Sequence, residues 1–581
     1  MRERPTRLLA VVVLLAAALI LLGSGGTTHA AAQRRATQKV FMPAVLQRPA
    51  EAATQDLTIT HLGLFQSVQT ATNSVSLIAD KPALLRVFAQ ATGTTIPPVA
   101  EVTVRAQRGE TYLGSLTLGP EAVSTQPTAG DLNTTFNFDL PSSWLSGDVT
   151  LTATIDAVNT VPEANEVNNA HTSQFSFLEV APLQLTIIPI RYTHTPTGQE
   201  FLDPPHDPVS NWLQGAFPVS RVDVSYHVPF SFSGDLRQPG EWQRLLEELS
   251  TLSAAEVGQG SATVYYGLIP TVNASGATWF EGGVSGFGWI GQRVSLGLDV
   301  GAATGNSAGH ELGHNFGRHH APCGNPSSVD PHYPYPNATI GVYGVDTEEE
   351  LLLAPAANFD MMSYCGPEWV SDYTYEGLLN NQLMRAAQTS QPSEGLLVRA
   401  MLETDTAEAT AAGGLPEVNV LPVYRLSGTA PAADDNGYTA QLLDASGAIV
   451  ATQPAALFVA EEEGVSAQML VAHMPTPDTA VAAVRFVRDG RVVGQRVVSA
   501  GEAEMGATAA AQATADGMAL TWGRADVPAL VRVSVDGVNW TTVALDALGG
   551  QLTVARDQLP AGGVIQIVPG DGSPAVNFEV E

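Results

Sequence analysis

The sequence predicts a multidomain protein in which an α+β domain is flanked by all-β sandwich domains. A chain of 581 residues is too long for one hydrophobic core, so about three to five domains are expected. Its 54 Gly and 38 Pro residues indicate many turns, which favours β-rich modules over helical bundles. The middle of the chain combines long apolar runs with apolar residues at helical spacing, so we expect strands and helices together there.

The N-terminus, residues 1–32, has the pattern of a secretory signal peptide. Three arginines precede an apolar run from Leu8 to Leu22, and small residues follow it. The run is short for a bilayer span, so an uncleaved anchor is the alternative. Residues 33–55, rich in Ala, Gln, Thr and Pro, are predicted to be a linker. We expect an exported protein, secreted or associated with the cell surface, with no membrane segment beyond the export signal.

Residues 56–180 are predicted to form a β-sandwich. Segments such as VAEVTVRAQR and DVTLTATID alternate apolar and polar residues and are separated by turn residues. The end of this region is similar to the CARDB-like, adhesion-related sandwich modules of bacterial surface proteins. Those modules carry an Asn-rich turn before their last strand, and Glu166, Asn168 and Asn169 match it.

Residues 181–395 are predicted to form the α+β domain. The run LQLTIIPIRY suits a strand buried on both faces, and SATVYYGLIP and RVSLGLDV suit further strands. PGEWQRLLEELSTLSAAEV has apolar residues at helical spacing, and WVSDYTYEGLLNNQLMRAA predicts a helix capped by Ser371. Residues 396–501 and 502–581 are predicted to form two β-domains, with Asp-Gly turns at 489–490 and 536–537.

The chain is strongly acidic, with 58 Asp and Glu against 27 Lys and Arg and a formal net charge of −31. A surface of this sign repels phosphate groups, so we expect no nucleic-acid partner and no binding to anionic membranes. The simplest role of the charge is solubility. The sequence sets no oligomeric state.

The stretch HELGHNFGRHH carries the predicted chemistry. His310 and His314 are four residues apart, so one helical face can offer both imidazoles to one metal ion. Glu311 lies beside the metal and can take a proton from a metal-bound water. Gly317 can adopt a left-handed conformation that ends the helix, which lets the chain return with a third imidazole from His320. Three nitrogens and a water make the open tetrahedron of a catalytic zinc site, whereas buried core histidines are the alternative.

This stretch resembles the HExxHxxGxxH signature of the metzincin zinc peptidases, which is followed by a methionine turn. NFDMMSYCG at 358–366 matches that turn, with Met362 as its methionine. The resemblance implies a metzincin-like catalytic domain with zinc ligands His310, His314 and His320 and the general base Glu311. His319 is left as a neighbour, because the shorter return would leave its ring on the other side of the turn.

The resemblance also implies that Tyr364 approaches the zinc or stabilises an oxyanion, and the alternative is a tyrosine that only packs in the turn. Cys323 and Cys365 most simply form a disulfide, which would tie the third-ligand loop to the methionine turn; otherwise one of them binds the metal. GGVSGFGWIG at 282–291 is the candidate edge strand for a bound peptide, and an ordinary Gly-rich hairpin is the alternative.

From these features we expect a secreted zinc-dependent endopeptidase whose substrates are extracellular proteins, including glycoproteins. Similarity to large secreted bacterial zinc peptidases, some of which cleave mucin-like glycoproteins, favours that substrate class. One alternative is a surface adhesin or binding protein that carries an inactive or incidental metallopeptidase domain. Another is a metal-dependent hydrolase of a non-peptide bond, which the methionine turn disfavours.

Overall fold

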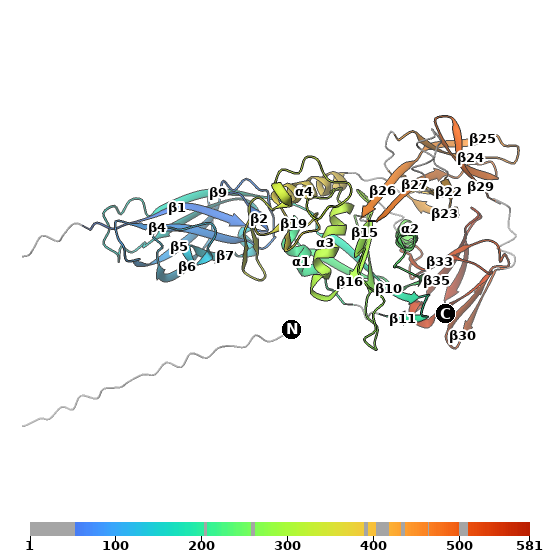
Figure 1. Ribbon diagram of the computed structural model, residues 1–581, viewed down its shortest axis with the longest axis horizontal. Coiled ribbons are helices and arrows are strands. Elements are labelled where there is room, and N and C mark those ends of the chain that lie inside the picture. Colours follow the sequence, from blue (N-terminus) through green and yellow to red (C-terminus); the bar gives the residue numbers. More distant parts are fainter. Residues whose placement is uncertain are drawn as a thin grey trace, which may run out of the picture. The chain divides into compact units, whose positions relative to one another are not determined.

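The structure is a computed structural model, and it describes residues 53–202, 206–256, 262–387, 393–402, 418–431, 436–462, 464–498 and 509–580. The predicted signal peptide, residues 1–32, and the linker up to residue 52 lie outside the described residues. Ala53–Glu581 form one compact unit (Figure 1). Among the described residues, no helix is both long and apolar enough to cross a membrane.

The first region has two sheets around one hydrophobic core. Its main strands are β1 (Asp56–Phe65), β3 (Leu77–Ile78), β4 (Leu84–Thr92), β5 (Val99–Arg108), β6 (Thr111–Ala122), β7 (Phe136–Asp139), β8 (Gly147–Ile155) and β9 (Ala170–Leu178). The strand orders are β1-β4-β7 and β3-β9-β8-β5-β6. Alternate residues of β8 are buried, as the alternation of apolar and polar residues predicts. The strands predicted in this part of the chain are therefore confirmed.

The Asn-rich turn before β9 is held by a different glutamate from the one that the resemblance picked out. The Asn169 side-chain amide donates to Glu163 Oε1 at 2.9 Å, and the Leu57 N–H donates to Glu163 Oε2 at 2.6 Å. Burial raises the pKa of Glu163, although these hydrogen bonds oppose it. Glu166 is exposed. The turn thus closes the sandwich through Glu163.

The middle region is built on a seven-stranded sheet. Its elements are β10 (Leu183–His194), β11 (Gln199–Phe201), α1 (Ser210–Ala216), β12 (Val222–Tyr226), β13 (Phe230–Gly234), α2 (Pro239–Glu256), β14 (Val264–Pro270), β15 (Gly286–Gly288), β16 (Val294–Asp299) and α3 (Thr304–Asn315). The order is β11-β10-β14-β16-β15, and β12 and β13 also pair with β10. β10, β14 and β16 are parallel, whereas β15 is antiparallel to β16 and forms one edge.

The predicted fold class is wrong. We expected an α+β metzincin-like catalytic domain flanked by all-β domains, but strands make up 47% and helices 13% of a mostly β, multidomain chain. An α+β domain segregates its helices from an antiparallel sheet. Here the central pairings are parallel, and α2 lies between β13 and β14 in the chain. The physical reason is that apolar runs such as LQLTIIPIRY need cover on both faces, which parallel strands with crossover segments receive.

Short elements follow α3 and complete the surroundings of its C-terminal end. They are β17 (Tyr343–Asp346), β18 (Leu351–Leu353), β19 (Phe359–Asp360), β20 (Glu368–Trp369) and α4 (Asp372–Ala387). β17 pairs with β18 and with β2 (Val68–Gln69) from the first region. The Ser371 hydroxyl accepts the Thr374 N–H at 3.1 Å, so the predicted cap of α4 is confirmed.

The long elements in the described residues of the last part of the chain are strands. A five-stranded sheet contains β21 (Ser393–Leu402), β22 (Val418–Val420), β23 (Tyr424–Gly428), β26 (Ala456–Glu462) and β27 (Val465–Pro475). Beside it in sequence are β24 (Tyr438–Leu443), β25 (Ile449–Pro454), β28 (Ala483–Arg488) and β29 (Arg491–Val497). The final strands are β30 (Ala510–Thr514), β31 (Gly517–Thr521), β32 (Ala529–Ser534), β33 (Thr541–Ala547), β34 (Gln551–Ala555), β35 (Gly563–Pro569) and β36 (Val576–Val580).

Strand β26 lies at one edge of the five-stranded sheet. The order of the five-stranded sheet is β22-β21-β27-β26, so β26 is its outermost strand. β26 and β27 are antiparallel, with Glu462 paired to Val465 at the turn between them. Figure 1 shows this hairpin next to β15, the edge strand of the middle sheet.

Candidate metal centre

Helix α3 is fixed against β15 and β16 by the residue at its C-terminal end. The Asn315 side-chain amide donates to the carbonyls of Trp289 and Val294, each at 3.0 Å, and its oxygen accepts the Ser295 hydroxyl at 2.9 Å. All of these groups are buried, where each hydrogen bond that fails to form would be costly. The helix face that carries the first two histidines is therefore held in one orientation.

Gly317 reverses the chain at the end of α3. Its φ of +76° lies in the left-handed region, and its N–H donates to the His314 carbonyl at 2.8 Å. The next N–H, that of Arg318, donates to the Gly313 carbonyl at 3.0 Å. The returning chain brings a buried His320 side chain to the helix, whereas His319 is exposed.

The three histidines are each held through Nδ1. Each Nδ1 lies within hydrogen-bond distance of a backbone carbonyl: His310 with Met361 at 2.7 Å, His314 with Arg318 at 2.8 Å, and His320 with Ser327 at 2.6 Å. A carbonyl can only accept, so these contacts assign the proton to Nδ1 and leave the Nε2 lone pair free for another partner. This is the arrangement in which proteins hold histidines that bind metals.

The Nε2 atoms converge on one point. His314 Nε2 and His320 Nε2 are 3.2 Å apart, and together with His310 and Glu462 they lie within 4.8 Å of one another. Two ligands that bind one tetrahedral ion at about 2.0–2.1 Å should be about 3.3–3.4 Å apart. Burial lowers the pKa of His314 to about 4 against the opposing effect of Glu462, so this ring is neutral near pH 7. The residues fit a metal ion, and the group of four buried side chains could bind one.

Glu311 lies beside this point and does not belong to the converging set. It is 3% exposed, and its Oε2 atom is buried without a hydrogen-bond partner. Burial, reinforced by the charge of Glu462, raises its pKa well above the ordinary value. A Cβ at Gly286 would lie 2.2 Å from Glu311 Oε1, so the glycines of β15 leave the room that this side chain occupies. A buried carboxyl without a partner is suited to exchange a proton with a ligand.

Glu462 is the member of the site that the sequence analysis missed. Its Oε1 atom lies 3.1 Å from His314 Nε2, 3.2 Å from His320 Nε2 and 3.3 Å from His310 Nε2. Burial alone would raise the pKa of Glu462, but the three imidazole rings around its carboxylate hold that pKa well below its ordinary value. No local pattern marks this residue, because it is 142 positions from His320. The three glutamates at 461–463 were the only signal in the sequence.

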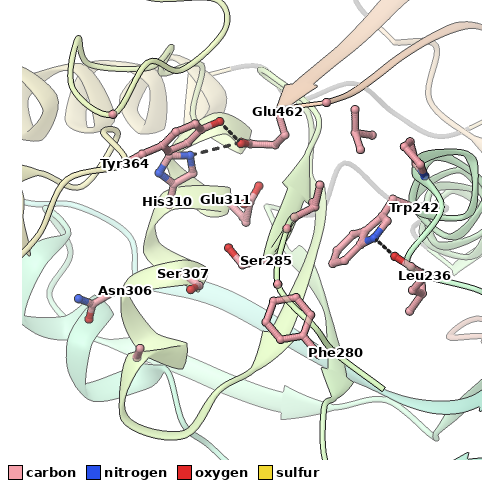
Figure 2. A pocket seen from close by; sticks show the side chains of 18 of the residues that line it. Leu236, Trp242, Phe280, Ser285, Asn306, Ser307, His310, Glu311, Tyr364 and Glu462 are labelled. Atoms are coloured by element: carbon pink, nitrogen blue, oxygen red, sulfur yellow. Dashed lines mark hydrogen bonds and ion pairs between the residues drawn. The ribbon is translucent and has the colours of Figure 1, made fainter. Parts of the chain in front are cut away.

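Tyr364 belongs to the same cluster. Its hydroxyl donates to Glu462 Oε2 and lies 3.3 Å from His320 Nε2 (Figure 2). The tyrosine therefore does more than pack in the turn, although its present partner is a carboxylate of the chain itself.

The methionine turn lies under the histidines. Met361 and Met362 are each 1% exposed, and the Met361 carbonyl is the partner of His310. A Cβ at Gly313 would be only 2.3 Å from Met362 Sδ, so Met362 packs on the helix between the two ligand positions. Asp360, which the sequence analysis did not single out, accepts the Met362 N–H at 2.8 Å and fixes the turn.

Cys323 and Cys365 form a disulfide, with a Cα–Cα distance of 5.7 Å. The bond joins the loop that follows His320 to the chain that follows Met362, and the Tyr364 N–H donates to the Cys323 carbonyl at 3.0 Å. Both sulfurs are thereby removed from the set of metal ligands.

A pocket of about 900 Å³ opens over Glu311. It is lined by aromatic and small polar side chains, among them Trp242, Trp279, Phe280, Ser285, Asn306 and Ser307 (Figure 2). Residues 282–285 line one wall, and β15 follows directly after them. Just beyond that strand, the Ile290 N–H donates to the Val459 carbonyl of β26 at 2.8 Å. The predicted edge strand is thus present, but a strand of the same chain lies against its end.

The family profile named CARDB matches residues 97–173, so the first region contains a CARDB domain, a cell-adhesion-related module. This domain type is associated with cell surfaces, consistent with an extracellular location. A CARDB domain from Pyrococcus furiosus, solved in complex with di-metal ions, is 23% identical and covers 22% of this chain and 90% of that chain, with a TM-score of 0.15. No curated protein matches the chain.

Several solved structures cover far more of the chain at lower identity. A β-glucuronidase from Parabacteroides merdae is 9% identical over 90% of this chain and 77% of that chain, with a TM-score of 0.14. A glycosyl hydrolase family 2 member from Bacteroides cellulosilyticus is 10% identical over 89% and 78%, with a TM-score of 0.16. At TM-scores this low, none of these likenesses carries an argument about this chain.

Proposed function

We propose that the chain is an exported zinc-dependent endopeptidase that hydrolyses peptide bonds of extracellular proteins, including glycoproteins. One observation carries the proposal: three histidines held by backbone carbonyls aim their Nε2 atoms at one point, beside a buried and unpaired Glu311. The similarity of HELGHNFGRHH and the following methionine turn to the metzincin signature supports the reaction type. This similarity bears on the chemistry of the site, and the proposal does not extend it to the fold.

Each residue has a definite task in this proposal. His310, His314 and His320 hold the ion, and zinc there would polarise a carbonyl and make water a better nucleophile. Glu311 takes a proton from the attacking water as its oxygen bonds to the scissile carbon, and then delivers that proton to the leaving amine as the C–N bond breaks. The direction of the pKa shift of Glu311 favours the second step, in which the protonated carboxyl holds the proton and delivers it to the amine.

Tyr364 is the candidate oxyanion donor. Its hydroxyl lies 3.3 Å from His320 Nε2, which places a hydrogen-bond donor next to the converging nitrogens. Disulfide Cys323–Cys365 limits the movement of the backbone that carries this tyrosine and of the loop after His320. The backbone at Tyr364 and the loop after His320 are therefore both held in place by the disulfide.

The test uses the purified full-length protein and its Glu311→Ala variant. Zinc content is measured by mass spectrometry, and fragments of casein and mucin are followed with and without a chelator. We expect one zinc in both proteins and chelator-sensitive cleavage only by the parent. Zinc in both, with cleavage in neither even when Glu462 is also replaced by alanine, would refute the peptidase, and no zinc in either would refute the metal site.

A second candidate is a surface adhesin or binding protein whose metallopeptidase domain is inactive or incidental. The CARDB domain at residues 97–173 favours it, and so does the position of Glu462 among the histidines. Under this candidate, removal of Glu462 leaves the protein without hydrolytic activity, whereas the first candidate requires activity from an open site.

A further inference from the structure

Glu462 reaches the histidines from the tip of the hairpin formed by β26 and β27. It is the last residue of β26, and its side chain is only 9% exposed although it lies at a turn. Figure 2 shows its carboxylate joined by dashed lines to His310 and Tyr364, with the ribbon of β26 entering from the side opposite α3. An acidic side chain at a hairpin tip normally points into solvent, so this burial needs a cause.

The distances around Glu462 Oε1 are those of a fourth ligand. Oε1 lies 3.1, 3.2 and 3.3 Å from the three Nε2 atoms, and the Nε2 atoms of His314 and His320 are 3.2 Å apart. All four ligand atoms lie within 4.8 Å of one another. A tetrahedral site with ligands at about 2.0–2.1 Å needs separations of about 3.3–3.4 Å. Oε1 therefore lies where a fourth ligand would bind, the position that a catalytic site keeps open for water or substrate.

The hairpin is docked against the chain that follows β15, beside the metal centre. The Ile290 N–H donates to the Val459 carbonyl at 2.8 Å, and the rings of Trp289 and Phe458 meet edge to face at 6.1 Å. These contacts join the edge strand of the middle sheet to the outermost strand of the five-stranded sheet. An extended peptide would bind along that same edge by adding a strand.

The rest of the hairpin's sheet is anchored to α2. Arg399 of β21 is 1% exposed, and its guanidinium donates to Glu247 and Thr251 of the helix. The Gln243 side chain donates to the Ser466 carbonyl at the start of β27. The hairpin thus has support on both its strands, and Glu462 is not held by the histidines alone.

We infer that the β26–β27 hairpin is a built-in inhibitory strap: Glu462 closes the metal centre as its fourth ligand while β26 lies against the end of the substrate edge at Ile290. The inhibitory role rests on the proposed function, whereas closure of the metal centre by Glu462 does not. Hydrolysis then requires that the hairpin withdraw, which releases the fourth coordination position, the edge at Ile290 and the hydroxyl of Tyr364 together.

The first experiment measures closure without measuring activity. The full-length protein is loaded with Co²⁺, and its visible absorption is titrated with acetohydroxamate, which binds only where a coordination position is free. Parent, Glu462→Ala and Glu462→Gln are compared. The control is Glu461→Gln, the neighbouring residue on the same strand, which is half-buried and lies outside the group of four.

Closure predicts that the spectra of the parent and of Glu461→Gln do not change with acetohydroxamate. The Glu462→Ala spectrum should shift, and its zinc affinity should fall by about tenfold or more, since an anionic ligand is lost. Glu462→Gln keeps the size and shape of the side chain, so it reports on closure even if the alanine variant unfolds. A parent spectrum that responds as strongly as those of both Glu462 variants overturns the inference.

Casein cleavage by the same proteins separates this inference from the proposed function. Stronger cleavage by Glu462→Ala than by the parent supports both. An opened Co²⁺ site without any cleavage refutes the peptidase and leaves closure standing. Equal cleavage by parent and variants, with a parent site that already binds acetohydroxamate, refutes the strap and leaves the peptidase standing.

Discussion

The substitution Gly286→Ala should disable the general base without removing the metal ligands. A Cβ at this position would lie 2.2 Å from Glu311 Oε1, 2.6 Å from Cδ and 2.7 Å from Cγ. Ordinary van der Waals contact begins at 3.4 Å, so the carboxylate has to move by about 1 Å. The three heavy atoms nearest to that Cβ all belong to Glu311 and none belongs to a histidine.

A misplacement of about 1 Å in a catalytic group costs about 100-fold in rate. We therefore expect Gly286→Ala to lower peptide hydrolysis by about 100-fold at unchanged zinc content, measured both in the parent and in a Glu462→Ala background so that closure cannot hide the effect. The matched control is Gly240→Ala, where no heavy atom lies within 4 Å of the added Cβ. Full activity of Gly286→Ala with zinc bound would refute the role of Glu311. Loss of zinc would show that the space beside Gly286 is needed by the metal ligands and not by Glu311 alone.

Three further predictions concern stability. Arg399→Met should lower the free energy of unfolding by about 3–5 kcal/mol, because it leaves the buried Glu247 carboxylate unpaired. Hydrogen exchange of α2 should become faster, and adding Glu247→Leu should slow it again. Unchanged exchange in Arg399→Met would contradict this. Replacing Cys323 and Cys365 by serine opens a loop with a separation of 42 residues, so the cost should be about 4 kcal/mol; a thermal transition equal to that of the parent would contradict this. Burial lowers the pKa of His227, but the Glu256 carboxylate more than offsets it, so the folded pKa lies above 6.5. The contribution of the pair is then complete below pH 6.5 and is lost as the pH rises through the folded pKa, so the difference in melting temperature between parent and His227→Gln should shrink with rising pH. A difference in melting temperature that stays constant with pH would contradict this role of the His227–Glu256 pair.

Local signals in the sequence were enough to place the elements around the site. The strand at LQLTIIPIRY, the helix that begins at Pro239 and the cap at Ser371 follow from spacing and side-chain type, and each is confirmed. The left-handed φ at Gly317 was likewise expected from its position after the second histidine. These features depend on residues within a few positions of one another, which is the range over which a sequence pattern is informative.

What the sequence did not reveal depends on distant parts of the chain. The carbonyls that hold the histidines come from loops, and a backbone group leaves no trace in residue type. Glu462 comes from a separate sheet, so only the docking of β26 on the middle region brings it to the site. The fold class was wrong for a related reason: helical periodicity in a few segments received more weight than the pairing direction of the strands, which no local pattern specifies.

The pairing of β2 with β17 has a mechanical consequence. Ser67 accepts hydrogen bonds at its carbonyl from the Val345 N–H at 2.8 Å and the Trp369 indole at 3.1 Å, on either side in sequence of the methionine turn. The first region, which contains the CARDB domain at residues 97–173, is thus bonded through Ser67 to the backbone on both sides of the methionine turn. A pulling force on the first region would be borne in part by these bonds, so tension would act on the segment that supports the metal site.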